Sequence, residues 1–201
     1  MTSSENELSL DEQIEKAVSV LSRDGLIVYP TETVYGLGAD ALSETAVMNV
    51  YQAKKRLLGK PISVAVSDIE MIYGVAEVDD ISAAFIKKFL PGPVTVILRA
   101  KDVLPSELTG GTGMIGIRYP DHQTALKLIE AFDCPITATS ANLAGEVSPV
   151  TAEMVNVPHD YLIDGGVLAG TPSTVVNLAE RKIVRPGAML DEVAEFLKEH
   201  L

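Results

Sequence analysis

Apolar and polar residues alternate along this chain in blocks that favour helices and strands in turn. Ser9 and Glu12 have the spacing of a capping box, and the apolar residues that follow them recur at helical intervals. This pattern predicts a helix that ends near Gly25. The next apolar run, residues 26–29, is closed by Pro30 and is typical of a buried strand.

The same alternation continues to the end of the chain. Polar residues suited to helix N-caps, Ser43, Asp80 and Asp121, introduce three more helices, and a last helix is predicted over 191–201. Short apolar runs predict strands at 62–66, 94–98, 114–118, 136–139, 173–178 and 182–185. The last two strands are too close together for a helical crossover, so the sheet should be mixed. We therefore predict one α/β domain over residues 9–201, a twisted mixed parallel and antiparallel sheet with flanking helices, after a flexible N-terminus at residues 1–8.

Composition agrees with an ordinary globular domain. The 201 residues are 47% hydrophobic, which is enough to bury a core without disulfides or a structural metal. The single Cys134 can form neither an internal disulfide nor a cysteine-based zinc site, and no hydrophobic signal segment opens the sequence. No apolar run approaches the length of a membrane-spanning helix. The expected location is therefore the cytoplasm, with no membrane partner.

Charge is distributed unevenly along the chain. With 28 acidic and 16 basic residues the net charge is −12, which argues against a surface that attracts nucleic acid as a whole. Residues 45–67 are the exception, because they hold a cluster of cations and no Asp or Glu: Lys54, Lys55, Arg56 and Lys60. Gly59 and Pro61 are poor helix formers, so the helix should end here and let these groups fan out around a polyanion. A solvated basic helix end is the alternative.

Polar residues at strand ends add candidate chemistry. Arg118 closes an otherwise apolar strand and must find an anion or several acceptors. Ser140 and Asn142 follow another strand and suit hydrogen bonding to phosphate or sugar oxygens, with helix capping as the alternative. No Gly-x-Ser-x-Gly motif supports acyl-enzyme chemistry, and no spacing of His, Cys or acidic residues indicates a protein metal site. A Mg²⁺ ion held by substrate phosphates would leave no such signature.

Several short motifs, each weak alone, occur together in this chain. They are the segment 29–38 (YPTETVYGLG), Lys54-x-Arg56, 91–95 (PGPVT), 116–120 (GIRYP), 140–142 (SAN) with 148–149, 172–174 (PST) and 185–187 (RPG). In this order the set resembles the YrdC family of threonylcarbamoyl-AMP synthases over residues 10–190. The resemblance implies a nucleotidyltransferase that makes L-threonylcarbamoyladenylate and pyrophosphate from L-threonine, bicarbonate and ATP. That reaction is the first step of N6-threonylcarbamoyladenosine formation at position 37 of tRNA.

The resemblance also implies roles for individual residues. ATP would be held by Lys54, Arg56, Lys60, Ser140, Asn142, Ser148 and Arg185 and by the backbone at Met114, with Lys54 and Arg56 the catalytic pair. Threonine would be held by Thr33, Arg118 and Ser173 and by the backbone at Ala138. Mg²⁺ would enter on the ATP phosphates. A downstream threonylcarbamoyl transferase would receive the product, and the resemblance allows a weak contact with tRNA.

Two alternatives stay open at this point. One is a YrdC-like module that binds double-stranded RNA or tRNA, although the net charge of −12 and the small cationic cluster count against it. The other is a related paralogue that handles a carbamoyl-adenylate. The intact Lys54-x-Arg56 and Ser140-x-Asn142 pairs favour the synthase.

Overall fold

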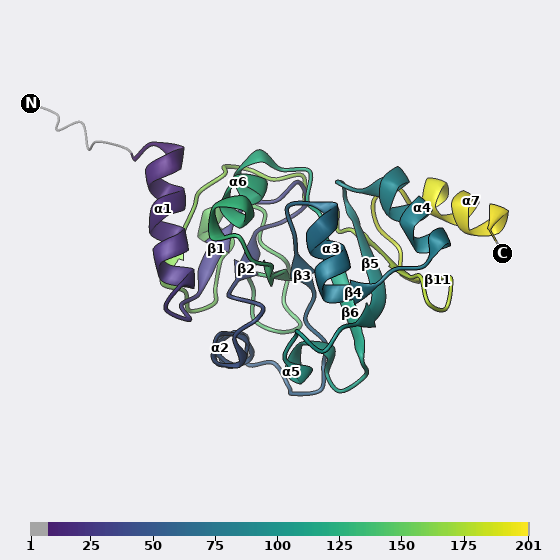
Figure 1. Ribbon diagram of the computed structural model, residues 1–201. Coiled ribbons are helices and arrows are strands. Elements are labelled where there is room, and N and C mark those ends of the chain that lie inside the picture. The colour runs from purple at the N-terminus through teal and green to yellow at the C-terminus, as the bar shows by residue number, and fades with distance from the viewer. Residues whose placement is uncertain (1–7, 201) are drawn as a thin grey trace, which may run out of the picture.

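The computed structural model describes residues 8–200 (Figure 1). The expectation of a flexible N-terminus at residues 1–8 falls outside the described residues except at Leu8. The helices are α1 (Leu10–Leu21), α2 (Glu44–Ala53), α3 (Ile69–Val75), α4 (Asp80–Phe89), α5 (Ser106–Thr109), α6 (Gln123–Phe132) and α7 (Leu190–Glu199), with a 3₁₀ turn at Ala152–Met154. Among residues 8–200, no helix is both long enough and apolar enough to cross a membrane.

The strands form two sheets rather than one. The smaller sheet has the order β8-β2-β1-β9, from β1 (Ile27–Tyr29), β2 (Gly36–Gly38), β8 (Thr139–Ser140) and β9 (Tyr161–Leu162). The larger has the order β11-β10-β5-β6-β3-β7, from β3 (Val64–Ala65), β5 (Val94–Ala100), β6 (Met114–Arg118), β7 (Ile136–Thr137), β10 (Thr174–Asn177) and β11 (Lys182–Arg185), while β4 (Ala76–Glu77) pairs with β5. Both sheets mix parallel and antiparallel pairs, and β10 and β11 are antiparallel neighbours. The α/β class and the mixed pairing are thus confirmed.

The two sheets meet at Ala138. The run predicted as one strand over 136–139 is divided there, with β7 in the larger sheet and β8 in the smaller. The N–H of Ala138 donates to the carbonyl of Ser63 at 2.7 Å, and the N–H of Thr137 donates to the carbonyl of Ala39 at 2.8 Å. The chain therefore changes partners within three residues, and the side chains around this switch face the space between the sheets.

Strand β1 is buried on both faces, which explains its unbroken apolar run. Ile27 and Tyr29 belong to a core that also contains Leu21 of α1 and Leu128 of α6, whereas Val28 belongs to the larger core. Helices α1 and α6 lie together at one end of the molecule, and α4 and α7 lie at the other (Figure 1). Between these two helical ends, the loops that follow the strands are free to form a site.

Local capping chemistry decides where helices begin. Ser9 and Glu12 form the predicted capping box, and the Ser43 hydroxyl accepts from the N–H of Ala46 at 3.2 Å. Two expected caps are wrong. Asp79, not Asp80, caps α4, because its carboxylate accepts from the N–H of Ser82 at 2.7 Å. Asp121 does not cap α6 either, since that helix begins after His122 without a side-chain cap.

Strand β2 lies inside a segment that the sequence suggests is a loop. Its Gly-Leu-Gly run has little intrinsic strand preference, because glycine brings no side chain to pack. The structure requires the glycines for another reason: a Cβ at Gly36 would lie 2.9 Å from the Tyr29 ring, and one at Gly38 would lie 3.0 Å from it. The aromatic side chain of β1 therefore covers β2, and packing rather than propensity makes this strand.

Candidate active site

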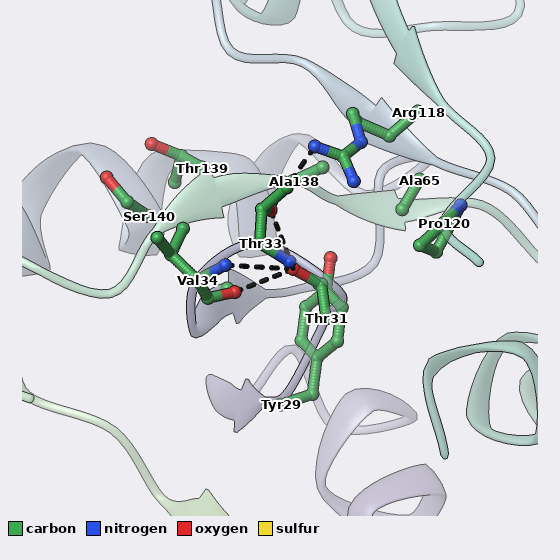
Figure 2. Close-up of a pocket in the computed structure, with 11 residues that line it drawn as sticks. Tyr29, Thr31, Thr33, Val34, Ala65, Arg118, Pro120, Ala138, Thr139 and Ser140 are labelled. Atoms are coloured by element: carbon green, nitrogen blue, oxygen red, sulfur yellow. Dashed lines mark hydrogen bonds between the residues drawn. The ribbon is translucent and has the colours of Figure 1, made fainter. Parts of the chain in front are cut away.

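A cleft with two connected compartments opens where the sheets meet. The wide compartment has a volume of about 270 Å³ and the small one about 50 Å³. They share a wall formed by Thr33, Val34, Arg118, Ala138, Thr139 and Ser140. Figure 2 shows the small compartment, with the Arg118 guanidinium directed toward Thr33 and the turn at Ala138 beside both. One ligand can therefore extend from one compartment into the other.

The wide compartment is lined by cations and hydroxyl groups. Arg56 and Arg185 line it, and neither Asp nor Glu is among its lining residues. The Arg185 guanidinium donates to the Ser173 carbonyl at 2.9 Å and to its hydroxyl at 3.0 Å. The Ser173 hydroxyl also lies 2.8 Å from that of Thr95. Burial, and to a lesser extent the charge of Arg118, lowers the pKa of Arg185. An anion bound here would be attracted by the guanidinium groups of both Arg185 and Arg118.

Arg56 organises the loop that follows α2. Its Nε donates to the Lys60 carbonyl at 3.3 Å and one terminal nitrogen donates to the Pro61 carbonyl at 2.8 Å. The helix ends at Ala53 with Lys54 as its C-cap, before the Gly59 and Pro61 that were expected to end it, and the turn lets Arg56 reach the cleft. Lys60 is exposed and does not line the cleft.

Lys54 does not fan outward with the other cations. Its side chain is 2% exposed, and its ammonium donates to the carbonyls of Ser140 and Asn142, the latter at 2.6 Å. Burial, followed by the charge of Arg56, lowers the pKa of Lys54 to about 8, so the group is still mainly protonated at neutral pH. The expectation that Lys54 would spread outward with the other cations around a polyanion was therefore wrong. As the C-cap residue of α2, Lys54 points behind the cleft wall rather than into the cleft.

Arg118 finds its anion within the chain. Its guanidinium forms an ion pair with the Glu32 carboxylate and lies 3.4 Å from the Thr33 hydroxyl. The pair is largely buried, with 10% and 16% of the two side chains exposed. Two polar atoms of the pair, Arg118 Nε and Glu32 Oε2, are buried without a hydrogen-bond partner. The need for an anion was predicted, but the sequence did not indicate Glu32 as its source.

The small compartment suits a small side chain. Tyr29, Ala65 and Pro120 supply its apolar walls, and Thr31 and Thr33 supply hydroxyl groups. The Tyr29 hydroxyl donates to the Thr137 carbonyl at 3.2 Å, and burial raises the pKa of Tyr29, so this group stays neutral. The compartment therefore combines apolar walls and hydroxyl groups with one charged side chain, that of Arg118.

Tyr35 is a second residue that sequence reasoning missed. Its hydroxyl accepts from the N–H of Gly165 at 2.9 Å and lies 2.8 Å from both Asp164 Oδ1 and the Gly166 carbonyl. Burial, followed by the hydrogen bond with Asp164, raises the pKa of Tyr35 to about 12. Tyr35 thus holds the loop at Gly165 and Gly166. The same loop reaches the cleft at Thr33, because the N–H of Gly170 donates to the Thr33 carbonyl at 2.8 Å.

Most of the predicted site residues come together around the cleft. Those that line it are Thr33, Arg56, Arg118, Ala138, Ser140, Ser148, Ser173 and Arg185. Lys54, Lys60, Met114 and Asn142 do not line it. Met114 lies in the β5–β6 ladder opposite Arg99, and the amide of Asn142 donates to the carbonyls of Leu143 and Glu146 at 3.0 and 2.7 Å. The Asn142 side chain therefore shapes the loop behind Ser140. Sequence reasoning gave Glu32 and Tyr35 no role. The only feature of the sequence that could have pointed to them is that both lie in the 29–38 motif.

Close packing at Gly187 provides a test of how rigidly the cleft is built. An added Cβ would lie 2.3 Å from the Pro172 carbonyl oxygen and 2.6 Å from that of Ser173. We expect Gly187→Ala to lower the free energy of unfolding by about 1–3 kcal/mol, because the backbone beside Arg185 must move away from Ser173. Urea denaturation measures the loss. Gly74→Ala is the control, since its Cβ would meet open space on a helix; equal stability of the two variants would contradict the expectation.

Comparisons with known proteins identify the family of this chain. The family model Sua5_yciO_yrdC, described as telomere recombination, matches residues 19–187. The chain is 37% identical over 198 residues to threonylcarbamoyl-AMP synthase from Pyrococcus abyssi, covering 93% of this chain and 58% of the relative. It is 39% identical over 196 residues to the Bacillus subtilis enzyme of the same name, covering 92% and 56%. The chain thus spans just over half the length of these two relatives.

Solved structures show the same fold. The crystal structure of Pyrococcus abyssi Sua5 complexed with L-threonine matches with a TM-score of 0.89 at 36% identity, covering 95% of this chain and 58% of that one. Since the family model covers most of the chain, the assignment does not depend on any single motif. The chain belongs to the Sua5/YciO/YrdC family.

Proposed function

We propose that this chain is an L-threonylcarbamoyladenylate synthase. Bicarbonate and the threonine amine would form a carbamate and release water. A carbamate oxygen would then attack the α-phosphorus of ATP and release pyrophosphate. The observation that carries the proposal is that the two compartments adjoin: Arg118 lines both of them, and Arg56 and Arg185 line the wide one. The names of the relatives, and the threonine complex of one of them, support the choice of substrates.

The amino acid would occupy the Arg118 side of the cleft. A carboxylate suits the guanidinium of Arg118 and the hydroxyls of Thr33 and Ser173 beside it. The N–H of Ala138 is already bonded to Ser63, so its carbonyl is the backbone group left for the ligand. The threonine methyl and hydroxyl groups match the mixed apolar and hydroxyl lining of the small compartment.

ATP would occupy the wide compartment. Arg56, Arg185, Ser140 and Ser148 line it and can contact the polyphosphate, and the exposed Lys60 can reach in from the loop after α2. No side-chain nucleophile is needed, because the carbamate itself attacks. What the residues supply is position and positive charge as charge moves to the leaving pyrophosphate. We assign that catalytic role to Arg56.

Three further residues would support the ATP site from behind. The Lys54 ammonium donates to the carbonyls of Ser140 and Asn142. We therefore propose that, within the catalytic pair, Lys54 is the positioning residue, which acts by fixing this loop. The Asn142 amide bonds the same loop. Met114 contributes backbone at the start of β6. In this proposal the whole segment 9–201 acts as one domain.

Mg²⁺ would enter with ATP. The wide compartment offers hydroxyl and carbonyl oxygens but no carboxylate, and residues 8–200 contain no group of three His, Cys, Asp or Glu side chains that could hold a metal. This donor set fits an ion coordinated chiefly by phosphates, which keeps its remaining ligands as water. When bound, the ion would share the charge of the leaving pyrophosphate with Arg56 and Arg185.

The product requires a partner. A mixed anhydride of carbamate and AMP is an acyl donor, so a downstream transferase would pass the threonylcarbamoyl group to position 37 of tRNA. We propose that these steps take place in the cytoplasm. Contact of this chain with tRNA itself would be weak, given its net charge of −12.

Pyrophosphate release tests the proposal. We expect release to require ATP, L-threonine and bicarbonate together, and Arg56→Ala to lower kcat/KM about a hundredfold, which corresponds to about 2.7 kcal/mol of transition-state stabilisation. Arg23→Ala is the control, because the Arg23 side chain is exposed just after α1 and donates to the Ser19 carbonyl, away from the residues that line the cleft. Release that continues without threonine or without bicarbonate would contradict the function. A loss of less than about tenfold in Arg56→Ala would contradict the catalytic role.

A further inference from the structure

The ion pair between Glu32 and Arg118 is largely buried. It lies at the end of the cleft where the proposed function places the amino acid. Its side chains are 16% and 10% exposed, whereas the Glu77–Arg99 pair between β4 and β5 has side chains that are 64% and 69% exposed. Charges buried to this degree are screened far less than surface charges. Arg118 lines both compartments and Glu32 lines neither, so Glu32 would act on a ligand there through its charge.

Arg118 alone would favour any carboxylate, but Glu32 cancels its charge. The Glu32 carboxylate would repel a carboxylate bound to Arg118, and a ligand that brings only a carboxylate has no group to offset that repulsion. An α-amino acid brings a carboxylate and an ammonium group and adds no net charge. The pair itself has one unpartnered atom of each kind, the Arg118 Nε donor and the Glu32 Oε2 acceptor. The pair therefore keeps one hydrogen-bond donor and one acceptor that no described residue uses.

We propose that Glu32 is a specificity-determining residue that makes the site select amino acids over carboxylic acids that lack the α-amino group. The inference rests on the proposed function, since it concerns the amino-acid substrate of that site. Arg185 lies close enough to Arg118 for their charges to interact, but it would attract the carboxylate of either ligand equally, so it does not change the difference between ligands with and without an amino group. Glu32 acts by charge on the bound amine and by holding Arg118, and it need not take part in the transfer to ATP.

The test compares two ligands that differ only in the amino group. L-threonine and (R)-3-hydroxybutyrate have the same carboxylate, hydroxyl and methyl groups, and their dissociation constants can be measured by ligand-observed NMR titration. We expect the wild-type protein to bind threonine about thirtyfold or more tightly than the hydroxy acid, and Glu32→Gln to reduce that ratio about tenfold or more. The ratio should fall for two reasons. Threonine loses an ionic partner and binds more weakly, while the hydroxy acid is no longer repelled and binds more tightly.

A purely structural role for Glu32 makes a different prediction. If Glu32 only holds Arg118 in place, Glu32→Gln should weaken both ligands by the same factor, and a ratio that stays within about threefold of the wild-type value would overturn the proposal. Glu32→Asp keeps the charge and should keep most of the preference for threonine. Glu77→Gln, the same change in the exposed pair with Arg99, is the control and should change neither constant.

The outcomes separate this inference from the proposed function. Wild-type protein that binds both ligands within about threefold of each other would overturn the role of Glu32 even if Glu32→Gln failed to fold. If pyrophosphate release needs threonine while the binding ratio is unchanged in Glu32→Gln, the inference alone fails. If wild-type release does not need threonine, the proposed function fails.

Discussion

Replacing Arg118 with alanine is expected to lower kcat/KM for threonine about a hundredfold or more, which corresponds to about 2.7 kcal/mol or more of lost transition-state stabilisation. Two effects add in the same direction. The substrate carboxylate loses its charge-assisted hydrogen bonds, and Glu32 is left as a largely buried anion that repels it. Steady-state pyrophosphate release at varied threonine concentration measures the change. The KM for ATP should change much less, because the loss falls on the amino-acid end of the cleft.

Arg99→Ala is a matched control for this prediction. Arg99 also pairs with a glutamate, Glu77, at 3.5 Å, but both side chains are more than half exposed. Pairs of this kind contribute about 0–1 kcal/mol, so the control should keep nearly full activity. A fall of less than about tenfold in Arg118→Ala would contradict the placement of the carboxylate.

Replacing Lys54 with methionine is expected to have the second large effect, on stability and activity together. Methionine has nearly the same length but cannot donate, so the carbonyls of Ser140 and Asn142 would be left without their buried ammonium partner. The expected loss in the free energy of unfolding is about 2–4 kcal/mol. Because Ser140 lines both compartments, kcat/KM should fall about tenfold or more as the loop moves. Urea denaturation and pyrophosphate release measure the two effects.

Lys55→Met provides the control for charge. Lys55 is the next residue, carries the same charge and is exposed, so its loss should change the free energy of unfolding by less than about 0.5 kcal/mol. If both variants lost the same stability, the buried hydrogen bonds of Lys54 could not be the cause.

The lowered pKa of Lys54 also predicts how stability depends on pH. The folded protein releases this proton near pH 8, whereas an unfolded lysine releases it near about 10.4. Between these values the unfolded chain binds more protons, so this group makes the free energy of unfolding rise as pH rises. Urea denaturation at pH 7, 8 and 9 should show wild-type stability rising relative to that of Lys54→Met. Parallel pH curves for the two proteins would mean that Lys54 keeps an ordinary pKa.

The elements that local patterns decide were predictable from the sequence. The bounds predicted for β6 and β11 are those of the structure, and Ser9 and Ser43 begin α1 and α2 as expected. Each of these depends on side chains within a few residues of one another: an apolar run, or a polar cap followed by an apolar helical face. Most motif residues meet at the cleft for a different reason: they lie beside strands whose ends come close together in the folded sheets.

What the sequence could not decide involves partners that are distant along the chain. Glu32 and Arg118 are 86 positions apart, and Lys54 bonds carbonyls 86 and 88 positions away. Strand β2 exists because Tyr29 packs over glycines that have no strand preference of their own. By itself, the sequence determined the hydrophobic pattern, the helix caps and the set of motifs, because these follow from neighbours along the chain. Only the tertiary structure decided which charge faces the cleft and which is buried behind it, because desolvation and pairing depend on the segments that folding brings together.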